Sequence, residues 1–378
     1  MNPTNQLNPT RNGHTVPSPI QEEESTGVFG ACPLPILDHP NIVLGHGSGG
    51  KLSAELIDKV FVQRFRNPIL DRMDDQAVLN IGGTRLAFTT DSFVVTPLFF
   101  PGGDIGHLAI NGTVNDLAMA GARPLYLSAA FILEEGLPTA DLTRIVDSMQ
   151  QAAHAAGVHL VTGDTKVVNR GKGDKIFINT SGIGLIEQPT EMSANRARPG
   201  DKVILSGFIG DHGITILSQR EHLEFESDLQ SDCAPLHSLV HEMLLESESA
   251  NALQGLRCMR DPTRGGVATV LNEIATKSQV GVLLHEAAIP IRESVRGACE
   301  VLGLDPLYVA NEGKLLAIVA PEIADRVLAR MRNHPTGAHS QIIGEVTDRP
   351  NGMVLMKTTV GGTRVVDVLF GEQMPRIC

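Results

Sequence analysis

A turn segment near residue 198 divides this 378-residue chain into two halves. Apolar content falls just before it, and Ala197-Arg198-Pro199-Gly200 then separates two apolar runs. A chain of this length is too long for one ordinary hydrophobic core, so two domains are expected. We therefore predict a first domain over residues 41–190 and a second over residues 198–358, followed by a strand and tail over residues 359–378.

Strands and helices alternate in both halves, which predicts an α+β protein made of two mixed α/β domains. The clearest helix starts at Thr139, a predicted N-cap, has apolar residues at helical spacing and ends at Gly157. A helix over residues 105–120 and a strand over 158–161 are also expected. The other predicted strands cover residues 85–90, 93–95, 203–206, 281–285, 315–319, 353–358 and 363–369, and the other predicted helices cover 213–221, 236–253, 291–302 and 321–333.

Composition argues against several classes of protein. The net charge is −12 with no run of Lys or Arg, which disfavours nonspecific binding to nucleic acid or to an anionic membrane. The longest apolar stretches fall well short of the roughly 20 residues that span a bilayer. Residues 1–40 lack the pattern of a secretory signal and are predicted to be a disordered extension. The five scattered cysteines fit neither a disulfide framework nor a CxxC zinc site, so the cytoplasm is the expected compartment.

The glycine-rich segment from Gly45 to Lys51 is a candidate phosphate-binding loop. It fits GxxxxGK, but Leu52 stands where that motif needs Ser or Thr for magnesium. It also fits GxGxxG, but no βαβ unit with a following acidic residue is evident. Its glycines still let backbone N–H groups approach phosphate oxygens, while Lys51 and the helix expected from about Ser53 add positive potential. The alternative is a flexible surface turn.

Five aspartates lie just before or after predicted apolar strands and form a candidate metal site. Magnesium prefers oxygen ligands, and polyphosphate sites recruit carboxylates from separate elements. Taken singly, each residue is more often a turn or cap residue. Their grouping near glycine-rich segments favours a magnesium site made of Asp74, Asp75, Asp91, Asp116 and Asp164.

Two further segments place polar residues next to predicted elements. Asp261-Pro262-Thr263-Arg264-Gly265-Gly266 opens an apolar helix, where the Gly-Gly pair and Arg264 can receive an anion. A capped turn explains this segment equally well. Glu312, just before the strand predicted at 315–319, is a candidate base, and the alternative is a solvated turn residue.

The last residue, Cys378, is a candidate reactive group. Cysteine supplies 5 of 378 residues, so a terminal cysteine arises by chance in about 1% of cases. A thiol beyond Gly371 and Pro375 lies on a tail that can reach another site or another protein. The α-carboxylate is expected to raise the pKa of this thiol and Arg376 to lower it. Prenylation is excluded because its signal needs three residues after the cysteine.

Together these segments resemble the HypE family of hydrogenase maturation factors, within the superfamily of aminoimidazole ribonucleotide synthetase, selenophosphate synthetase and thiamine monophosphate kinase. They run in family order from about residue 41 to the end, and the final Pro-Arg-Ile-Cys is the signal specific to HypE. Only the N-terminal extension departs from the pattern. The matching segments are His46–Lys51, Asp74–Ala77, Thr90–Ser92, Asn115–Pro124, Gly163–Lys166, Asp261–Gly266, Asn311–Lys314 and Pro375–Cys378.

The resemblance implies a PurM-like fold that forms a homodimer through the sheets of its first domains. It also implies that ATP and Mg²⁺ are bound by the five aspartates together with glycine-loop and neighbouring residues. These cofactor-binding residues would be Gly47, Gly49, Gly50, Lys51, Asn115, Thr165 and Arg264.

The resemblance further implies a reaction on the tail. A HypF-type partner places a carbamoyl group on the Cys378 thiolate, ATP phosphorylates the carboxamide oxygen, and loss of phosphate and a proton leaves a thiocyanate. The cyano group then passes to iron held by a HypC–HypD complex. Lys166 would stabilise the transferring phosphoryl group, and Glu312 would accept the nitrogen proton. The tail is expected to be mobile because one thiol must meet several partners.

Two other functions stay open from the sequence. A small-molecule kinase or synthetase of the same superfamily would act on a free acceptor and would not need Cys378. A nucleotide-binding scaffold that regulates assembly would not hydrolyse ATP.

Overall fold

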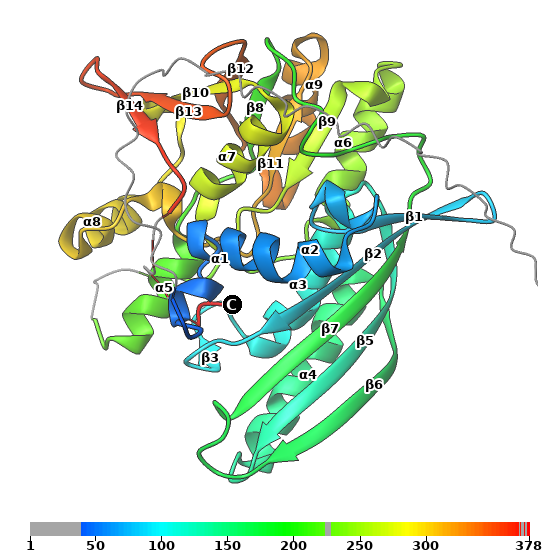
Figure 1. The fold of residues 1–378 in the computed structure, drawn as a ribbon, viewed down its shortest axis with the longest axis vertical. Coiled ribbons are helices and arrows are strands. Elements are labelled where there is room, and N and C mark those ends of the chain that lie inside the picture. Colours follow the sequence, from blue (N-terminus) through cyan, green and yellow to red (C-terminus); the bar gives the residue numbers. More distant parts are fainter. Residues whose placement is uncertain (1–38, 224–227, 370, 372–373, 375) are drawn as a thin grey trace, which may run out of the picture. The chain divides into compact units, whose positions relative to one another are not determined.

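The computed structural model describes residues 39–223, 228–369, 371, 374 and 376–378. The extension predicted over residues 1–40 lies outside these residues, except for its last two positions. Residues Ile42–Cys378 form one compact unit. In that unit the described strands form two large sheets, one from residues before position 190 and one from residues after position 200 (Figure 1). The domain boundaries themselves stay predictions.

The first sheet has five strands in the order β1-β2-β7-β5-β6. Neighbouring strands are antiparallel except β5 and β6, which are parallel. A separate two-stranded sheet pairs β3 (Phe99–Phe100) with β4 (Gly103–Asp104). The strands of the first sheet are β1 (Ala77–Ile81), β2 (Thr84–Phe93), β5 (Arg123–Glu134), β6 (His159–Val168) and β7 (Ile176–Leu185).

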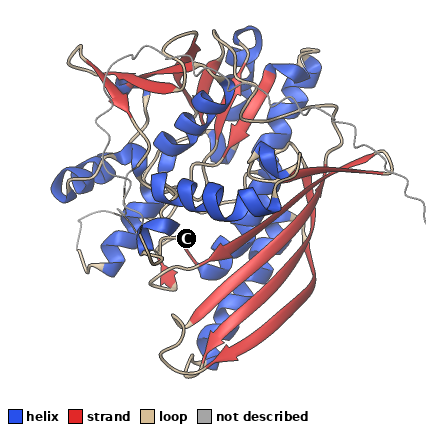
Figure 2. Cartoon of the chain, in the orientation of Figure 1, coloured by secondary structure: helices blue, strands red, loops and turns tan. Residues whose placement is uncertain are grey.

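Two helices cover one face of this sheet, α3 (Ile105–Met119) and α4 (Thr139–Ala156) (Figure 2). Asp104 caps α3, because its Oδ1 accepts from the backbone N–H groups of Gly106 and His107. Nearly every side chain of α3 is buried, since the helix contacts the first sheet, α4, and elements of the second half of the chain. Both predicted helices are confirmed. Gly157 ends α4 at φ 67°, but the N-cap is Pro138 and not Thr139.

The second sheet has seven strands in the order β14-β13-β10-β12-β8-β11-β9. Side chains alternate between its faces: Val203 and Leu205 pack with α7, whereas Ile204 between them packs with α6 and α9. The strands are β8 (Lys202–Leu205), β9 (Leu256–Arg260), β10 (Gly281–His285), β11 (Leu316–Val319), β12 (Gln341–Thr347), β13 (Met353–Lys357) and β14 (Thr363–Val366). The remaining α-helices are α1 (Lys51–Leu56), α2 (Gln63–Phe65), α5 (Asp211–Arg220), α6 (His237–Ser249), α7 (Gly266–Ser278), α8 (Glu293–Leu302) and α9 (Pro321–Arg332), and a π-helix over Ile57–Val62 joins α1 to α2.

Three expectations about local structure need correction. The strand predicted at 158–161 continues to Val168, so Gly163–Lys166 lies inside β6 and not in a loop. Asp91 lies inside β2 and Asp116 inside α3, rather than beside strands. Strands β1, β3, β4, β5, β7, β9 and β12 were not predicted. Within the described ranges, no helix is both long and apolar enough to cross a membrane.

Candidate active site

The C-terminal residues pair with the first half of the chain just after β2. Ile377 forms an antiparallel β-bridge with Val95. The backbone N–H of Val94 donates to a terminal oxygen of Cys378 at 2.9 Å, and the Ile377 side chain is only 3% exposed. Figure 1 marks this terminus beside β3 and α5. The last residue is therefore docked in the protein, in a position we call the tail seat (residues 376–378 with Val94–Thr96).

Charged side chains from three separate segments surround the Cys378 thiol. Burial raises the pKa of this thiol, the neighbouring Glu312 and Asp91 raise it further, and Arg264 lowers it. Arg376, which was expected to lower this pKa, pairs with Asp174 at 2.8 Å. Arg264 is the cation beside the thiol, and Cys378 is in turn the main cause of the raised pKa of Arg264.

Glu312 is a buried carboxyl group next to this thiol. Only 4% of the residue is exposed, so the alternative of a solvated turn residue is wrong. Burial raises its pKa well above 4.5, and repulsion from Asp261 and Asp232 adds to the shift. Its Oε1 has no hydrogen-bond partner among the described residues. A carboxyl group whose pKa is raised in this way accepts a proton more readily than an exposed one, as a general base requires.

Four aspartates from different elements gather near Glu312 and Cys378. Burial raises the pKa of each, to about 6 for Asp261. They also repel one another: Asp261, Asp75 and Asp91 all raise the pKa of Asp116. Arg260 offsets part of this charge through an ion pair with Asp75 at 2.8 Å. We call Asp75, Asp91, Asp116 and Asp261 the acidic cluster.

The structure thus brings together three of the five predicted metal ligands. Asp74 is occupied, because its carboxylate accepts from Ser193 Oγ and the Ala194 N–H and pairs with Arg72. Asp164 lies exposed on β6 and binds Lys166 at 2.7 Å. In the part of the chain that the structure covers, no three His, Cys, Asp or Glu residues are arranged to hold a metal ion.

The glycine-rich segment is a packed turn beside Arg264. A Cβ on Gly49 would lie 2.7 Å from the Arg264 carbonyl oxygen, and its φ of 77° also favours glycine. A Cβ on Gly50 would collide with the Leu369 carbonyl, which accepts from the Lys51 N–H at 2.9 Å. The Lys51 ammonium pairs with Asp367 at 3.1 Å. Gly47 has open space around its Cα, and Arg264 Nη1 donates to its carbonyl.

The other predicted residues fall into two places. Asn115 is buried, and its Nδ2 donates to the carbonyls of Ala234 and Glu312 while its Oδ1 accepts from the Leu236 N–H. In this conformation Asn115 positions Glu312. Thr165 and Lys166 lie exposed on β6, where the Lys166 ammonium binds Asp164 at 2.7 Å. Among the described residues, neither side chain has a hydrogen bond or ion pair with Cys378.

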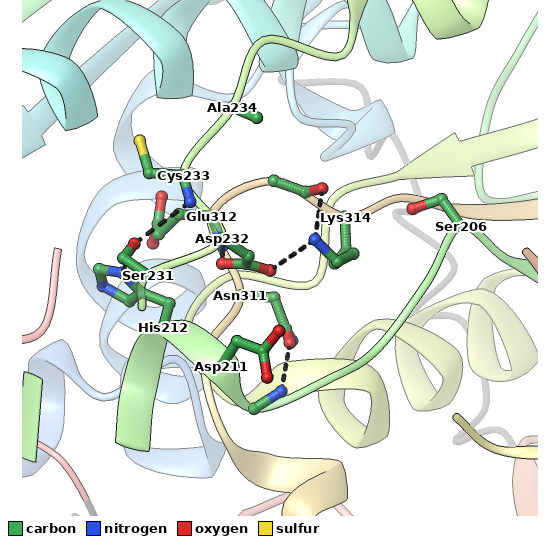
Figure 3. Close-up of polar contacts among 12 residues, drawn as sticks. Ser206, Asp211, His212, Ser231, Asp232, Cys233, Ala234, Asn311, Glu312 and Lys314 are labelled. Carbon is green, nitrogen blue, oxygen red and sulfur yellow. Dashed lines mark hydrogen bonds and ion pairs between the residues drawn. The ribbon is translucent and has the colours of Figure 1, made fainter. Parts of the chain in front are cut away.

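A polar pocket of about 530 Å³ lies behind Glu312, on the side of α5 and the segment before α6. Two ion pairs line it, Asp211 with Arg292 at 2.9 Å and Asp232 with Lys314 at 3.1 Å. Asp232 also connects this pocket to the active site, because its Oδ1 accepts from the Glu312 N–H at 3.0 Å (Figure 3).

Sequence reasoning missed Asp261, Asp232 and His212. Asp261 stands in the segment that already drew attention to Arg264, so its neighbours were a usable signal. Asp232 reaches Glu312 across 80 residues, and His212 reaches Ile377 across 165. No local sequence pattern predicts hydrogen bonds between residues that lie so far apart in the chain.

Comparison with known proteins identifies both halves. The model of the AIR synthase related protein N-terminal domain matches residues 73–186, and that of the C-terminal domain matches residues 198–357. The chain is 56% identical to the carbamoyl dehydratase HypE of Azotobacter vinelandii, over 90% of this chain and 98% of that protein. It is 48% identical to the Escherichia coli K12 protein of the same name, over 89% of this chain and 99% of the relative.

Solved structures agree with these matches. The crystal structure of a HypE–HypF complex aligns with a TM-score of 0.78 at 48% identity, over 83% of this chain and 99% of that one. A HypE crystal structure in complex with ATP aligns with a TM-score of 0.74 at 52% identity, over 89% of this chain and 100% of that one.

Proposed function

Because the chain belongs to the HypE family, with both AIR synthase related domains, we propose that it is an ATP-dependent carbamoyl dehydratase acting on its own last residue. The Cys378 thiol carries a carbamoyl group, which dehydration converts to a thiocyanate. This product supplies the cyanide ligand for the iron of a nickel-iron hydrogenase centre.

The observation that carries this proposal is the docking of Cys378 against Glu312 and Arg264, beside the acidic cluster. A kinase that acts on a free acceptor has no need to hold its own C-terminal thiol beside a buried carboxyl group. A scaffold that does not catalyse has no need for a carboxyl group with a strongly raised pKa at that place. The geometry therefore favours the dehydratase over both alternatives.

The chemistry follows from the poor leaving ability of an amide oxygen. The carboxamide oxygen attacks the γ-phosphorus of ATP, the P–O bond to ADP breaks, and an O-phosphorylated intermediate forms. The C–O bond then breaks, phosphate leaves, and the carbon–nitrogen triple bond forms as nitrogen gives up its two protons. One proton leaves with the phosphate, and Glu312 accepts the other. Arg264 is placed to stabilise negative charge beside the reacting group.

ATP and Mg²⁺ fit the acidic cluster on chemical grounds, with phosphate oxygens of ATP completing the coordination, since no three of the described carboxylates are arranged to hold a metal ion by themselves. Asp75, Asp91, Asp116 and Asp261 are oxygen ligands whose pKa values are raised by burial, and the buried Oδ2 of Asp75 has no hydrogen-bond partner in the described ranges. A divalent cation there would offset their mutual repulsion and neutralise charge on the phosphates. We assign the metal-holding role to these four residues, in place of Asp74 and Asp164.

Partner proteins follow from the same chemistry. We infer that a HypF-type carbamoyltransferase loads Cys378 and that a HypC–HypD complex receives the cyano group. Among the similar proteins, a HypE has been crystallised with HypF. When the tail is in its seat, the thiol lies beside Glu312. The tail must therefore move out of the seat to reach either partner. Mobility of the tail stays a prediction.

The exposed face of the first sheet supports a homodimer. Phe88, Ile183 and Tyr126 lie side by side across β2, β7 and β5, and each is at least 40% exposed. Lys166 on β6 is the register partner of Ile132 on β5. Ile132 is 44% exposed on this face, so Lys166 lies on the same face. Because apolar patches of this kind mark interfaces, we infer that a second copy covers the face and that Lys166 acts in the site formed between two copies.

An Ile183→Asp variant is expected to be monomeric. Burying an unpaired carboxylate in an apolar interface costs several kcal/mol, which is enough to dissociate the dimer at micromolar concentration. Light scattering measures the mass, and circular dichroism checks that the fold is retained. Val146→Asp is the matched control, because Val146 is 45% exposed on α4, away from the sheet face. A dimeric Ile183→Asp protein would contradict the proposed interface.

Glu312→Gln is expected to stop dehydration without stopping carbamoylation. Removal of a general base slows its step by about 10²–10⁴-fold. Purified carbamoylated protein is mixed with MgATP, and loss of water from the C-terminal peptide is followed by mass spectrometry. Glu187→Gln, at an exposed ion pair with Arg123, serves as the control.

The dehydration rate in the same assay is expected to change with pH in a defined direction. The base must be deprotonated, and the pKa of Glu312 is raised, so the wild-type rate should fall as pH falls through a value well above 4.5. A rate that stays constant down to pH 4.5, or a Gln variant with wild-type rate, would remove Glu312 from the mechanism.

A further inference from the structure

His212, the second residue of α5, is buried and uses both of its ring nitrogens. Nε2 lies 2.8 Å from the carbonyl oxygen of Ile377, the residue before the reactive cysteine. Nδ1 lies 2.8 Å from Ser231 Oγ. The ring also packs edge-on against Phe100, with 5.7 Å between centroids. Figure 3 shows the His212 ring turned toward Ser231, on the same side as Glu312.

The directions of these hydrogen bonds follow from the partners. A carbonyl oxygen only accepts, so Nε2 must carry the proton and donate to Ile377. The Ser231 hydroxyl then donates to Nδ1. Burial lowers the pKa of His212, which favours this neutral form. His212 therefore connects Ser231 to the backbone of the tail through one defined tautomer.

Ser231 belongs to a segment that is itself fixed to the active site. Its N–H donates to the Pro101 carbonyl at 2.9 Å, and its Oγ accepts from the Cys233 N–H. The next residue, Asp232, accepts from the Glu312 N–H. The carbonyl of Ala234 accepts from Asn115, which also holds the Glu312 carbonyl. Segment 231–234 thus joins His212 and Glu312 to one frame.

We propose that His212 is a positioning residue that holds the tail in its seat, so that the group on Cys378 meets Glu312. The role in dehydration rests on the proposed function, whereas the role in holding the tail does not. His212 acts on the backbone one residue before Cys378 and is not a member of the acidic cluster.

A second contact of the tail supplies a comparison. Arg220 Nη2 donates to the Arg376 carbonyl at 2.7 Å, and its Nε donates to the Thr96 carbonyl. Arg220 is partly exposed, whereas His212 is fully buried. Because water replaces an exposed hydrogen bond easily, Arg220→Gln should affect the tail much less than loss of the His212 donor.

The first test measures release of the tail without any catalysis. Resting protein is treated with iodoacetamide, and alkylation of the C-terminal peptide is followed by mass spectrometry. His212→Leu, of similar size but without a donor, should raise the alkylation rate of Cys378 by about tenfold or more. His212→Gln, whose amide can still donate to Ile377, should stay within about threefold of wild type, and so should Arg220→Gln.

The second test separates seating from loading. The tail leaves its seat to be carbamoylated, so His212→Leu should accept the carbamoyl group at least as fast as wild type. Single-turnover dehydration should be about tenfold slower or more, with the KM for ATP unchanged, and His212→Gln should recover most of the rate.

Three outcomes would overturn this inference. One is wild-type alkylation in His212→Leu; another is an equal increase in His212→Leu and His212→Gln; the third is slower carbamoylation together with slower dehydration, which would indicate general damage. If wild-type protein carries out no dehydration, the proposed function fails, but the alkylation result still decides whether His212 holds the tail.

Discussion

Cys378→Ala is expected to accept no carbamoyl group and to yield no cyano product, while it binds ATP as tightly as wild type. The thiol is the acceptor in our account, so its removal leaves no atom for the carbamoyl group. The proposed nucleotide ligands Asp75, Asp91, Asp116 and Asp261 come from other elements and do not depend on the last side chain. Intact mass measures loading, and calorimetric titration measures ATP affinity.

Cys233→Ala is the control for this experiment. Cys233 is a cysteine of segment 231–234, close to Glu312, and its Sγ accepts from Asn111 Nδ2 at 3.5 Å. Cys233 lies within segment 231–234 and not on the C-terminal tail, so the variant should be carbamoylated like wild type. Loading of Cys378→Ala would move the acceptor to another residue or to a free substrate.

Extension of the chain by one residue after Cys378 should also slow dehydration. A terminal oxygen of Cys378 accepts from the Val94 N–H at 2.9 Å, and an added residue would displace the terminal carboxylate from this end of the seat.

Asp116→Asn is expected to lose magnesium-dependent ATP turnover by about 100-fold or more, because it removes one charge from the proposed metal-holding group. The fold should not suffer. Burial and the other aspartates raise the pKa of Asp116, so folding disfavours its ionised form relative to the unfolded chain. Without Mg²⁺, the free energy of unfolding should therefore stay the same or rise, as measured by denaturant titration.

Asp74→Asn provides the opposite result. Asp74 accepts hydrogen bonds from Ser193 Oγ and the Ala194 N–H and lies outside the acidic cluster. This variant should keep ATP turnover but lose about 1–2 kcal/mol of stability. If Asp116→Asn turned over ATP normally with magnesium, the acidic cluster would be a structural feature and not a metal site.

Much of the helical structure was predictable because its signals are local. The helix α4 repeats its apolar residues at helical spacing and stops at Gly157, whose φ of 67° suits glycine. The sequence predicts strand β6 only to residue 161, because the polar segment Gly163–Lys166 has no local strand pattern. These residues are exposed on an edge strand, and the long-range pairing with β5 is what holds them in the sheet.

The active site was predictable only in part for the same reason. The grouping of Asp75, Asp91 and Asp116 followed from their motifs, but Asp74 and Asp75 are adjacent and only their distant partners distinguish them. Sequence proximity also assigned Arg376 to the thiol, whereas the fold brings Arg264 there from more than 100 residues away. Contacts between distant segments decide which of several plausible side chains reach the thiol.

The most direct test follows the tail through both steps. Wild-type protein is carbamoylated by a HypF-type enzyme with carbamoyl phosphate and ATP, purified, and then mixed with fresh MgATP. Mass spectrometry of the C-terminal peptide should first find a carbamoyl group on Cys378 and then, only after MgATP is added, the loss of one water from that peptide. A carbamoyl group on a different residue, or a Cys378 carbamoyl group that persists with MgATP, would contradict the account.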